Sequence, residues 1–364
     1  MNQTTLMNLY SNFVRSVSGQ RLALLLVMLL VGASGMANAG EGVEISEIVV
    51  FGDSLSDTGN VFMLTGLAPT PTSPQLPASP QWFNGRFTNG PVWHEILADG
   101  LGIMPASLSS FMGGRNFAWG GAEYGPGPAF AVAVPNVGAQ IDYYLTGVPP
   151  AFLPFLPPLP PGTPSDDQLF VVQAGNNDLI PPGAPTSPDD LVENVLDHVT
   201  TLAEAGARHF LVLGSVVVDT VPGLNPPLDA ALFFPETPTD AAIAEILTNA
   251  RIFNRTLHRA LFRLERRFKR DYDEPVTITY ANLARAGRIV SRRPALFGID
   301  EVATPALNAG PFPPTCFCGG TVADDPDRFF YFDIVHPTAT VHEIYGELAL
   351  AKLKWKLIWA RRHH

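Results

Sequence analysis

The stretch ISEIVVFGDSLSDTGN, residues 45–60, decides the fold. Its first seven residues form a short apolar, β-branched run that predicts a buried strand. Ser54 follows in a Gly-Asp-Ser turn, and a serine just past a parallel strand lies at the sheet edge where α/β proteins bind ligands. The unpaired N–H groups at the start of a following helix favour negative charge there. Taken alone, the turn also fits an ordinary helix cap.

The rest of the chain continues this alternation of strands and helices. The runs that predict further strands lie at 169–173, 210–218 and 276–280. A long helix at 239–268 has apolar residues near a 3.6-residue period, and a last helix starts at about Thr340, where Thr340 and Glu343 have capping-box spacing. This order predicts an α/β fold of three layers (α/β/α), with helices on both faces of a mostly parallel sheet. We expect a single domain over residues 40–364.

The amino end predicts a secretory signal peptide over residues 1–39. Two arginines, at 15 and 21, precede an apolar run over 22–33, and the segment ends in Ala37-Asn38-Ala39. The apolar run is too short for a membrane-spanning helix. We therefore expect cleavage after Ala39 and a secreted or periplasmic protein.

Composition excludes several classes of function. The 364 residues carry a formal net charge of −11; 16% are charged and 46% are hydrophobic, which suffices for a large core. We see no basic cluster in this acidic chain and expect neither a nucleic-acid partner nor attraction to anionic membranes, because both need concentrated Lys and Arg. Transient contact with lipid surfaces through apolar groups stays open.

Proline-rich stretches interrupt the alternation at 67–80, 148–164 and 221–238. Proline bars them from the interior of helices and strands. The middle stretch also carries Phe and Leu residues, so it forms either a lid or substrate-facing wall or a cover packed flat on the core. Cys316 and Cys318 are the only cysteines. A strained disulfide and two free thiols both stay open for them.

Three further segments suit the same sheet edge as Ser54. Residues 113–122 offer glycines whose backbone N–H groups can approach a ligand closely. Asn177 follows the second predicted strand and can aim its amide into the same crevice. Asp333 and His336 lie three residues apart, so the carboxylate can orient the imidazole. Each segment alone fits an ordinary turn or loop.

Together, these four segments resemble the motif blocks of the GDSL family, in the superfamily of SGNH hydrolases. The blocks read Gly52-Asp53-Ser54-Leu55, Asn116-Phe117-Ala118-Trp119-Gly120-Gly121-Ala122, Gly175-Asn176-Asn177-Asp178 and Asp333-Ile334-Val335-His336-Pro337-Thr338. The resemblance covers about residues 45–350 and looks closest to the bacterial secreted esterase and phospholipase- or hemolysin-like branch. With it we expect a flavodoxin-like winding of the sheet.

This resemblance implies a role for each matching residue. Ser54 would be the nucleophile, His336 the base that takes its proton, and Asp333 the group that orients His336. The oxyanion hole would combine the N–H of Ser54, the N–H of Gly120 in preference to Gly121, and the side chain of Asn177. No cofactor and no metal ion is expected.

We therefore predict a serine esterase or lipase that hydrolyses carboxylic esters through acyl-Ser54. The apolar proline-rich loops favour lipid-like or medium-chain esters. A polysaccharide acetylesterase and a lipid acyltransferase of the same fold are alternatives. A non-catalytic lipid- or glycan-binding relative is a third alternative. Such a protein does not need all four of the residues Ser54, Asn177, Asp333 and His336. The sequence does not indicate an oligomeric state.

Overall fold

The structure, a computed structural model of the 364-residue chain, describes residues 44–67, 75–77, 80–103, 108–125, 127–129, 133–180, 186–224, 239–308 and 320–362. The expected signal peptide and its cleavage site, both cysteines, and most of the first and third proline-rich stretches lie outside these residues. Within the described ranges, no helix combines the length and apolarity needed to cross a membrane.

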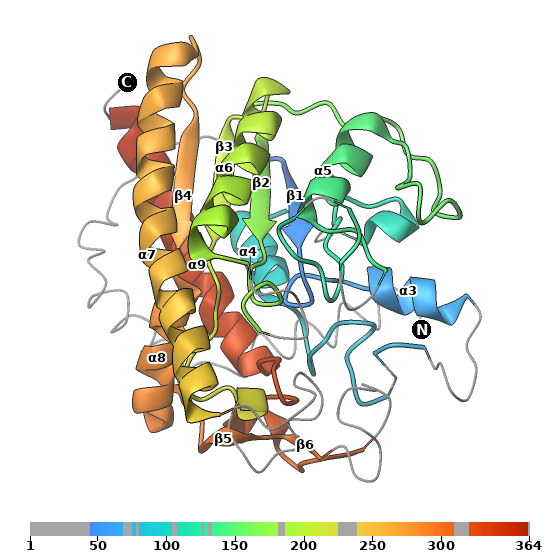
Figure 1. The fold of residues 1–364 in the computed structure, drawn as a ribbon, viewed down its shortest axis with the longest axis vertical. Coiled ribbons are helices and arrows are strands. Elements are labelled where there is room, and N and C mark those ends of the chain that lie inside the picture. Colours follow the sequence, from blue (N-terminus) through green and yellow to red (C-terminus); the bar gives the residue numbers. More distant parts are fainter. Residues whose placement is uncertain are drawn as a thin grey trace.

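A four-stranded parallel sheet forms the centre of the fold (Figure 1). In spatial order, its strands are β1 (Glu47–Gly52), β2 (Gln168–Gln173), β3 (His209–Leu213) and β4 (Thr277–Ala281). The strands are buried on both faces, which explains why they read as continuous apolar runs. All four predicted strands are confirmed, but the third ends at Leu213 because Asn176 and Asn254 bond the backbone that follows it.

A fifth segment, residues 115–119, extends the sheet on the free side of β1. The N–H of Val50 donates to the carbonyl oxygen of Arg115 (3.0 Å), and the N–H of Phe117 donates to the carbonyl oxygen of Val50 (2.7 Å). The chain thus places its second strand-like segment on one side of β1 and its third, β2, on the other. This reversal gives the predicted flavodoxin-like winding, and α/β proteins bind ligands at the carboxyl edge of such a switch point.

Helices pack on both faces of the sheet and give the predicted three layers (Figure 1). One face is covered by α5 (Val137–Thr146), α6 (Pro188–Glu204) and α7 (Asp240–Asp271). The other is covered by α4 (Trp93–Leu101) and α9 (Ala339–Arg362). Both α7 and α9 contact the edge strand β4, so they meet at that end of the sheet.

Shorter elements lead into and out of these layers. The remaining helices are α3 (Asn60–Gly66) and α8 (Leu283–Arg292). Two small ladders carry the chain from α8 to α9: β5 (Glu301–Pro305) pairs with β8 (Phe329–Tyr331), and β6 (Leu307–Asn308) pairs with β7 (Thr321–Val322). They bring the loop before α9 back to the carboxyl edge of the sheet.

Both predicted long helices are confirmed, as α7 and α9. The hydroxyl of Thr239 caps α7 by accepting the N–H of Ala242 (3.2 Å). The capping box predicted at Thr340 is wrong, because α9 begins one residue earlier. Thr340 lies inside the first turn, where its hydroxyl donates to the carbonyl oxygen of Asp327 (2.9 Å).

The proline-rich stretch 148–164 packs against α5. Leu153 and Leu156 are 4% and 2% exposed, and the Tyr143 hydroxyl of α5 donates to the carbonyl oxygen of Pro157 (2.5 Å). Of the two interpretations left open by the sequence, the structure supports the cover packed on the core. Val148 and Phe155 stay exposed at its surface.

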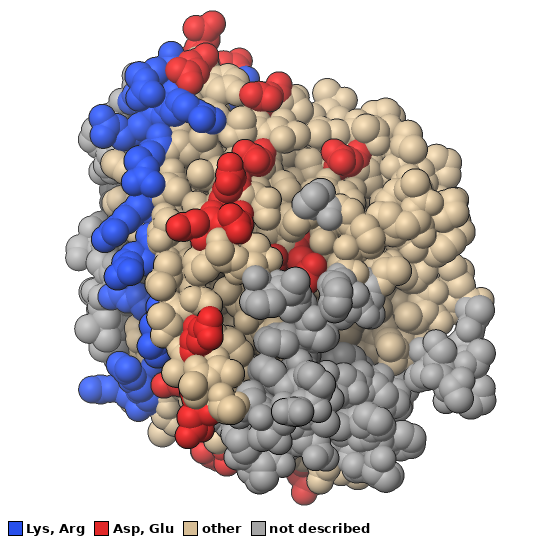
Figure 2. Space-filling view, viewed as in Figure 1, with Lys and Arg blue, Asp and Glu red and all other residues tan. Residues whose placement is uncertain are grey.

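Charge is distributed unevenly over the surface. Lys and Arg side chains gather in a band along α7 (Figure 2), and twelve of the chain's 23 Lys and Arg residues fall between residues 251 and 293. The prediction that the chain has no basic cluster is therefore wrong. The net charge of −11 concealed the cluster, because acidic residues are spread along most of the chain.

Candidate active site

Ser54, His336 and Asp333 form a continuous hydrogen-bonded chain at the carboxyl edge of β1. Ser54 Oγ lies 2.8 Å from His336 Nε2, and His336 Nδ1 lies 2.7 Å from Asp333 Oδ2. Asp333 and His336 are buried, whereas Ser54 is partly exposed. A serine hydroxyl that is open to solvent and bonded to an imidazole is placed for nucleophilic attack.

The loop before α9 fixes the orientation of the imidazole. Asp333 Oδ1 accepts the backbone N–H groups of Val335 (2.9 Å) and His336 (2.8 Å). The hydroxyl of Thr88 donates to the carbonyl oxygen of Pro337 (2.8 Å) and ties the loop to the rest of the fold. A proton on Nδ1, shared with the carboxylate, leaves Nε2 free to accept the serine proton.

An aromatic wall lies beside the imidazole. The ring centroids of Phe87 and His336 are 5.1 Å apart, with 35° between the ring planes. A Cβ atom added to Gly120 would come within 2.5 Å of the Phe87 ring, so glycine allows the motif around residue 120 to approach this wall. Burial on this side keeps water away from the imidazole, which strengthens its electrostatic interactions.

Asp53, the residue before the candidate nucleophile, is a buried carboxylate with several donors. Its Oδ1 accepts the N–H of Leu55 (3.0 Å) and the amide of Gln173 (2.9 Å), and its Oδ2 accepts the amide of Asn176 (3.0 Å). Burial raises the pKa of Asp53, and these hydrogen bonds oppose the rise. The carboxylate ties the end of β1 to the end of β2 and so holds two of the motif turns together.

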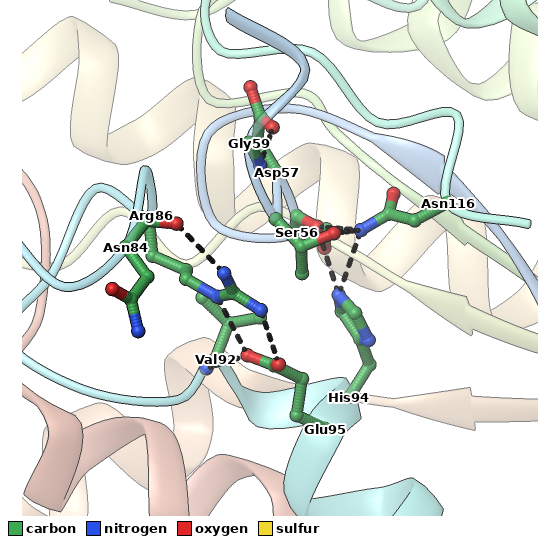
Figure 3. Close-up of polar contacts among 10 residues, drawn as sticks. Ser56, Asp57, Gly59, Asn84, Arg86, Val92, His94, Glu95 and Asn116 are labelled. Atoms are coloured by element: carbon green, nitrogen blue, oxygen red, sulfur yellow. Dashed lines mark hydrogen bonds and ion pairs between the residues drawn. The ribbon is translucent and has the colours of Figure 1, made fainter. Parts of the chain in front are cut away.

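Asp57 organises the turn that follows the candidate nucleophile (Figure 3). Its Oδ1 accepts the N–H groups of Gly59 (2.7 Å) and Asn60 (2.6 Å), and its Oδ2 accepts those of Val61 (3.2 Å) and Gly120 (3.0 Å). Burial raises the pKa of Asp57 to about 6, although the four hydrogen bonds lower it. The carboxylate thus satisfies N–H groups that the start of α3 leaves without helical partners.

The same contact corrects the prediction for Gly120. Its N–H donates to the Asp57 carboxylate and is not available to a ligand. The neighbouring Gly121 has a φ of 88°, in the left-handed region that favours glycine, and its N–H donates to no group in the part of the chain that the structure describes. We therefore replace Gly120 by Gly121 as the candidate donor. A motif alone does not show which of two consecutive N–H groups faces outward.

Asn177 lies in the turn after β2 and keeps donor capacity for a ligand. Its amide donates one N–H to the carbonyl oxygen of Ala122 (2.8 Å), and the second N–H of the same group is left over. The next residue, Asp178, accepts the N–H of Tyr124 (3.0 Å), and burial raises the pKa of Asp178 to about 7. These two bonds attach the turn after β2 to the glycine motif.

A second polar cluster, which sequence reasoning did not identify, lies behind the nucleophile turn (Figure 3). The amide of Asn116 donates to the carbonyl oxygen of Ser56 (2.6 Å), and His94 Nε2 lies 2.9 Å from the same oxygen. Arg86 forms an ion pair with Glu95 (2.7 Å). Burial alone would raise the pKa of Glu95, but Arg86, with His94 and the N–H of Val92, lowers it. The cluster fixes the backbone of the turn from the side of α4.

The site therefore combines a hydroxyl, an imidazole and a carboxylate in series, with amide donors beside them. This set supports acyl transfer through a covalent serine intermediate, with hydrogen bonds to the developing oxyanion. Among the residues described, no group of three or more His, Cys, Asp or Glu is arranged to hold a metal ion.

Comparisons with known proteins point to the same chemistry. The family model "GDSL-like Lipase/Acylhydrolase" matches residues 48–349. A GDSL esterase/lipase of Arabidopsis thaliana is 24% identical over 360 residues, which cover 90% of this chain and 95% of the relative. The thermolabile hemolysin of Vibrio parahaemolyticus is 25% identical over 322 residues, 84% of this chain and 63% of the relative. A phosphatidylcholine-sterol acyltransferase of Aeromonas hydrophila is 48% identical over 54 residues, 15% of this chain and 14% of the relative.

Proposed function

Since this chain belongs to the family of GDSL-like lipases and acylhydrolases and is a carboxylic ester hydrolase, we propose that it acts through an acyl intermediate on Ser54. The observation that carries the proposal is the 2.8 Å contact between Ser54 Oγ and His336 Nε2. Asp333 completes the series at 2.7 Å from the other ring nitrogen.

In the first step, Ser54 Oγ attacks the carbonyl carbon of the ester, and its proton moves to His336 Nε2. The carbonyl π electrons move to the oxygen, which becomes an oxyanion, and the Asp333 carboxylate stabilises the imidazolium through its bond to Nδ1. When the tetrahedral intermediate collapses, the bond to the leaving alkoxide breaks and His336 gives that oxygen the proton. The products of this step are an alcohol and acyl-Ser54.

In the second step, a water molecule attacks the acyl carbon and His336 takes its proton. The bond to Ser54 Oγ breaks, the serine regains its proton from His336, and a carboxylic acid leaves. In both steps, we assign oxyanion stabilisation to the N–H groups of Ser54 and Gly121 and to the remaining amide N–H of Asn177. Losing one such donor typically slows turnover by roughly 10²–10³-fold.

We further propose that the acyl group is lipid-like or of medium length. α3 directly follows the nucleophile turn, and Phe62, Met63 and Leu64 on it are partly exposed. Nearby, Leu67 and Met112 are 58% and 60% exposed, which makes an apolar rim that favours acyl chains over acetyl groups. The names of the hemolysin and the phosphatidylcholine-sterol acyltransferase among the relatives also support a lipid ester.

A panel of p-nitrophenyl esters from acetyl to palmitoyl, run beside phosphatidylcholine, tests the substrate class. We expect kcat/KM to rise from acetyl to medium chains and fatty acid to be released from the phospholipid, with both activities absent in Ser54→Ala. Preference for acetyl groups on a polysaccharide would favour the acetylesterase alternative. Transfer of the acyl group to an added alcohol in preference to water would favour the acyltransferase. No turnover of any ester by the parent would favour a binding protein.

We also propose that the chain is exported to the periplasm or beyond the cell. The basic, apolar and Ala-x-Ala segments of residues 1–39 support this proposal. Amino-terminal sequencing of the protein recovered outside the cytoplasm tests it. A start at Gly40 is expected, and a start at Met1 would contradict it.

A further inference from the structure

The basic band along α7 has a regular origin in its sequence. Arg251, Arg255, Arg259, Arg263 and Arg267 recur every four residues, and all five are exposed. Neighbours at this spacing lie on adjacent turns of a helix. Because four residues exceed one 3.6-residue turn, the row winds slowly around the exposed side of α7, and at 1.5 Å per residue it is about 24 Å long. We call these five residues the arginine face; α7, on which they lie, follows the blue band of Lys and Arg side chains in Figure 2.

Among the described residues, no carboxylate neutralises the arginine face. None of its five side chains lies within 4.0 Å of an Asp or Glu oxygen among the residues described. Glu265 is the one acidic residue of the chain between 251 and 270, and it pairs with Lys356 on α9 (2.7 Å). Like charges four residues apart destabilise a helix. The row therefore weakens the free protein slightly, and an anionic partner would relieve the repulsion.

α8 and α9 add cations to the same side of the molecule. Burial lowers the pKa of Arg288, and the nearby charges of Arg251 and Arg292 lower it further, while the Asp219 carboxylate opposes them. Burial and the nearby charge of Arg285 lower the pKa of Lys352. These cations are thus close enough to repel one another. The outer side of α7, α8 and the part of α9 around Lys352 form one positive surface.

Large apolar side chains protrude from this positive surface. Phe262 on α7 is 59% exposed, and Trp355 on α9 is 52% exposed. The two belong to the same side, because Lys356, next to Trp355, pairs with Glu265, which is three residues from Phe262. Cations combined with protruding aromatic side chains are typical of surfaces that bind at a lipid interface. A phosphate backbone of a nucleic acid would use the cations and leave these apolar groups without a role.

The arginine face begins on the part of α7 that packs at the carboxyl edge of the sheet. Asn254, one residue before Arg255, donates its amide to the carbonyl oxygen of Ser215, just after β3 at the carboxyl edge (2.9 Å). A Cβ atom on Gly175, in the turn after β2, would lie 3.1 Å from the ring of Phe253. The first half of α7 therefore borders the edge of the sheet that holds Ser54.

We propose that the arginine face docks the protein on the surface of an anionic phospholipid bilayer. The arginines contact the lipid phosphates, and Phe262 and Trp355 insert among the head groups. Docking brings the carboxyl edge of the sheet next to the membrane. The proposal goes beyond ester hydrolysis and does not depend on Ser54 being the nucleophile, because binding is measured without turnover.

Vesicle sedimentation tests this inference with the full mature chain in a Ser54→Ala background, which prevents lipid hydrolysis. We expect at least about 25-fold stronger partition into phosphatidylcholine vesicles that contain phosphatidylglycerol than into phosphatidylcholine alone, with the difference falling as salt is added. Each arginine near an anionic surface contributes roughly fivefold, so Arg255→Gln with Arg263→Gln should weaken partition roughly 25-fold. Phe262→Ser should weaken it further at constant charge.

The charge-matched control is Arg115→Gln with Arg328→Gln, which changes the net charge equally at sites away from α7, where the two arginines pair with Glu47 and Asp300. We expect at most about a twofold change in this control, since docking depends on position as well as net charge. Equal partition into neutral and anionic vesicles would overturn the inference, and so would equal losses in the two charge-matched variants. Binding of duplex DNA through Arg255 and Arg263, with no partition into anionic vesicles, would assign the surface to a nucleic acid instead. Circular dichroism confirms that each variant is folded.

Discussion

The carboxyl edge of β1 and the outer side of α7 treat charge in opposite ways. At the edge, the carboxylates of Asp53, Asp57 and Asp333 are buried, and each accepts at least three hydrogen bonds. On α7, the charges of the arginine face are exposed and have no acidic partner among the described residues. The first region fixes directions and distances, whereas the second provides a field that reaches into solvent.

This difference determines how each region responds to substitution. In the buried region, removing one group leaves its partners unsatisfied where the dielectric is low, so single changes have large effects on activity or stability. On the exposed helix, each charge contributes a small, salt-screened increment that adds to the others. We therefore expect the largest effects of substitution at the buried carboxyl edge and the smallest on the arginine face.

The largest effect is expected at Ser54. Ser54→Ala removes the attacking hydroxyl and should lower kcat on p-nitrophenyl butyrate by roughly 10⁴-fold or more, because the three residues act as a unit. Its thermal midpoint should stay close to that of the parent, since the hydroxyl is partly exposed. Ser46→Ala is the matched control, as Ser46 bonds to Asp167 at the surface (2.5 Å) and should keep parental activity. Parental turnover by Ser54→Ala would break the assignment.

The next effect separates two adjacent asparagines. Asn177→Ala should lower kcat by roughly 10²–10³-fold, about 2.7–4 kcal/mol, with little change in the free energy of unfolding. Asn176→Ala should instead lower the free energy of unfolding by about 1–3 kcal/mol, because Asp53 and the backbone N–H of Val216 lose their partner. Steady-state kinetics and urea unfolding of both variants measure the two quantities. Full activity in Asn177→Ala would remove it from the oxyanion hole.

The third prediction concerns titration of His342 in the buried region. Burial and, to a smaller extent, the nearby His336 and His94 lower the pKa of His342 from 6.5 to about 3, against the opposing charge of Glu95. Below pH 6.5 the unfolded chain binds a proton at this residue that the folded chain excludes, so stability is lost as the pH falls from about 6.5 to about 3.

His342→Asn tests this loss, because the asparagine oxygen can still accept the N–H of Trp93 that His342 Nδ1 accepts at 3.2 Å. Urea unfolding at pH 7 and pH 4 should show a loss of unfolding free energy that is about 3 kcal/mol smaller in the variant than in the parent. The difference between the two pH values is the readout, so a lower baseline stability of the variant does not affect it. Equal pH dependence in both proteins would count against a neutral, buried His342.

The smallest effect is expected on the arginine face. Arg255→Gln with Arg263→Gln removes like-charge neighbours and should raise the free energy of unfolding by about 0.2–0.5 kcal/mol per repulsive pair at low ionic strength. The gain should vanish in concentrated salt, since these charges are exposed. Urea unfolding at the two salt concentrations measures it. A loss of stability would reveal attractive contacts of these arginines and contradict the contrast.

Much of the fold could be predicted because its signals are local. Apolar β-branched runs gave the four strands, and the 3.6-residue period gave α7. The sequence did not predict the strand-like segment 115–119, because its pairing with β1 depends on tertiary contacts. Its residues, Arg-Asn-Phe-Ala-Trp, do not form a strand pattern. The basic band along α7 was not predicted for another reason. The net charge of the whole chain does not show where along the chain the Lys and Arg residues are concentrated.

The motifs predicted the site residues whose side chains have a single role. They did not predict the oxyanion donor, because that depends on which neighbouring group accepts each backbone N–H. Ser54, Asp333 and His336 lie together as the motifs predicted, 2.7–2.8 Å apart in series. Gly120 was the wrong donor because Asp57 takes its N–H, a contact between residues 63 positions apart that no motif records. The supporting roles of Asp53 and Asp57 depend on burial, which the sequence did not reveal.

The most direct test of the account is the covalent step at Ser54. Treatment of the parent with a fluorophosphonate, followed by peptide mass spectrometry, should place one phosphonyl adduct on the peptide of residues 45–60 at Ser54. Labelling should parallel the loss of esterase activity, and His336→Ala should label far more slowly because the serine loses its base. Two results would contradict the account. One is an adduct at another residue that abolishes activity; the other is complete reaction with the fluorophosphonate that leaves Ser54 unlabelled and the esterase fully active.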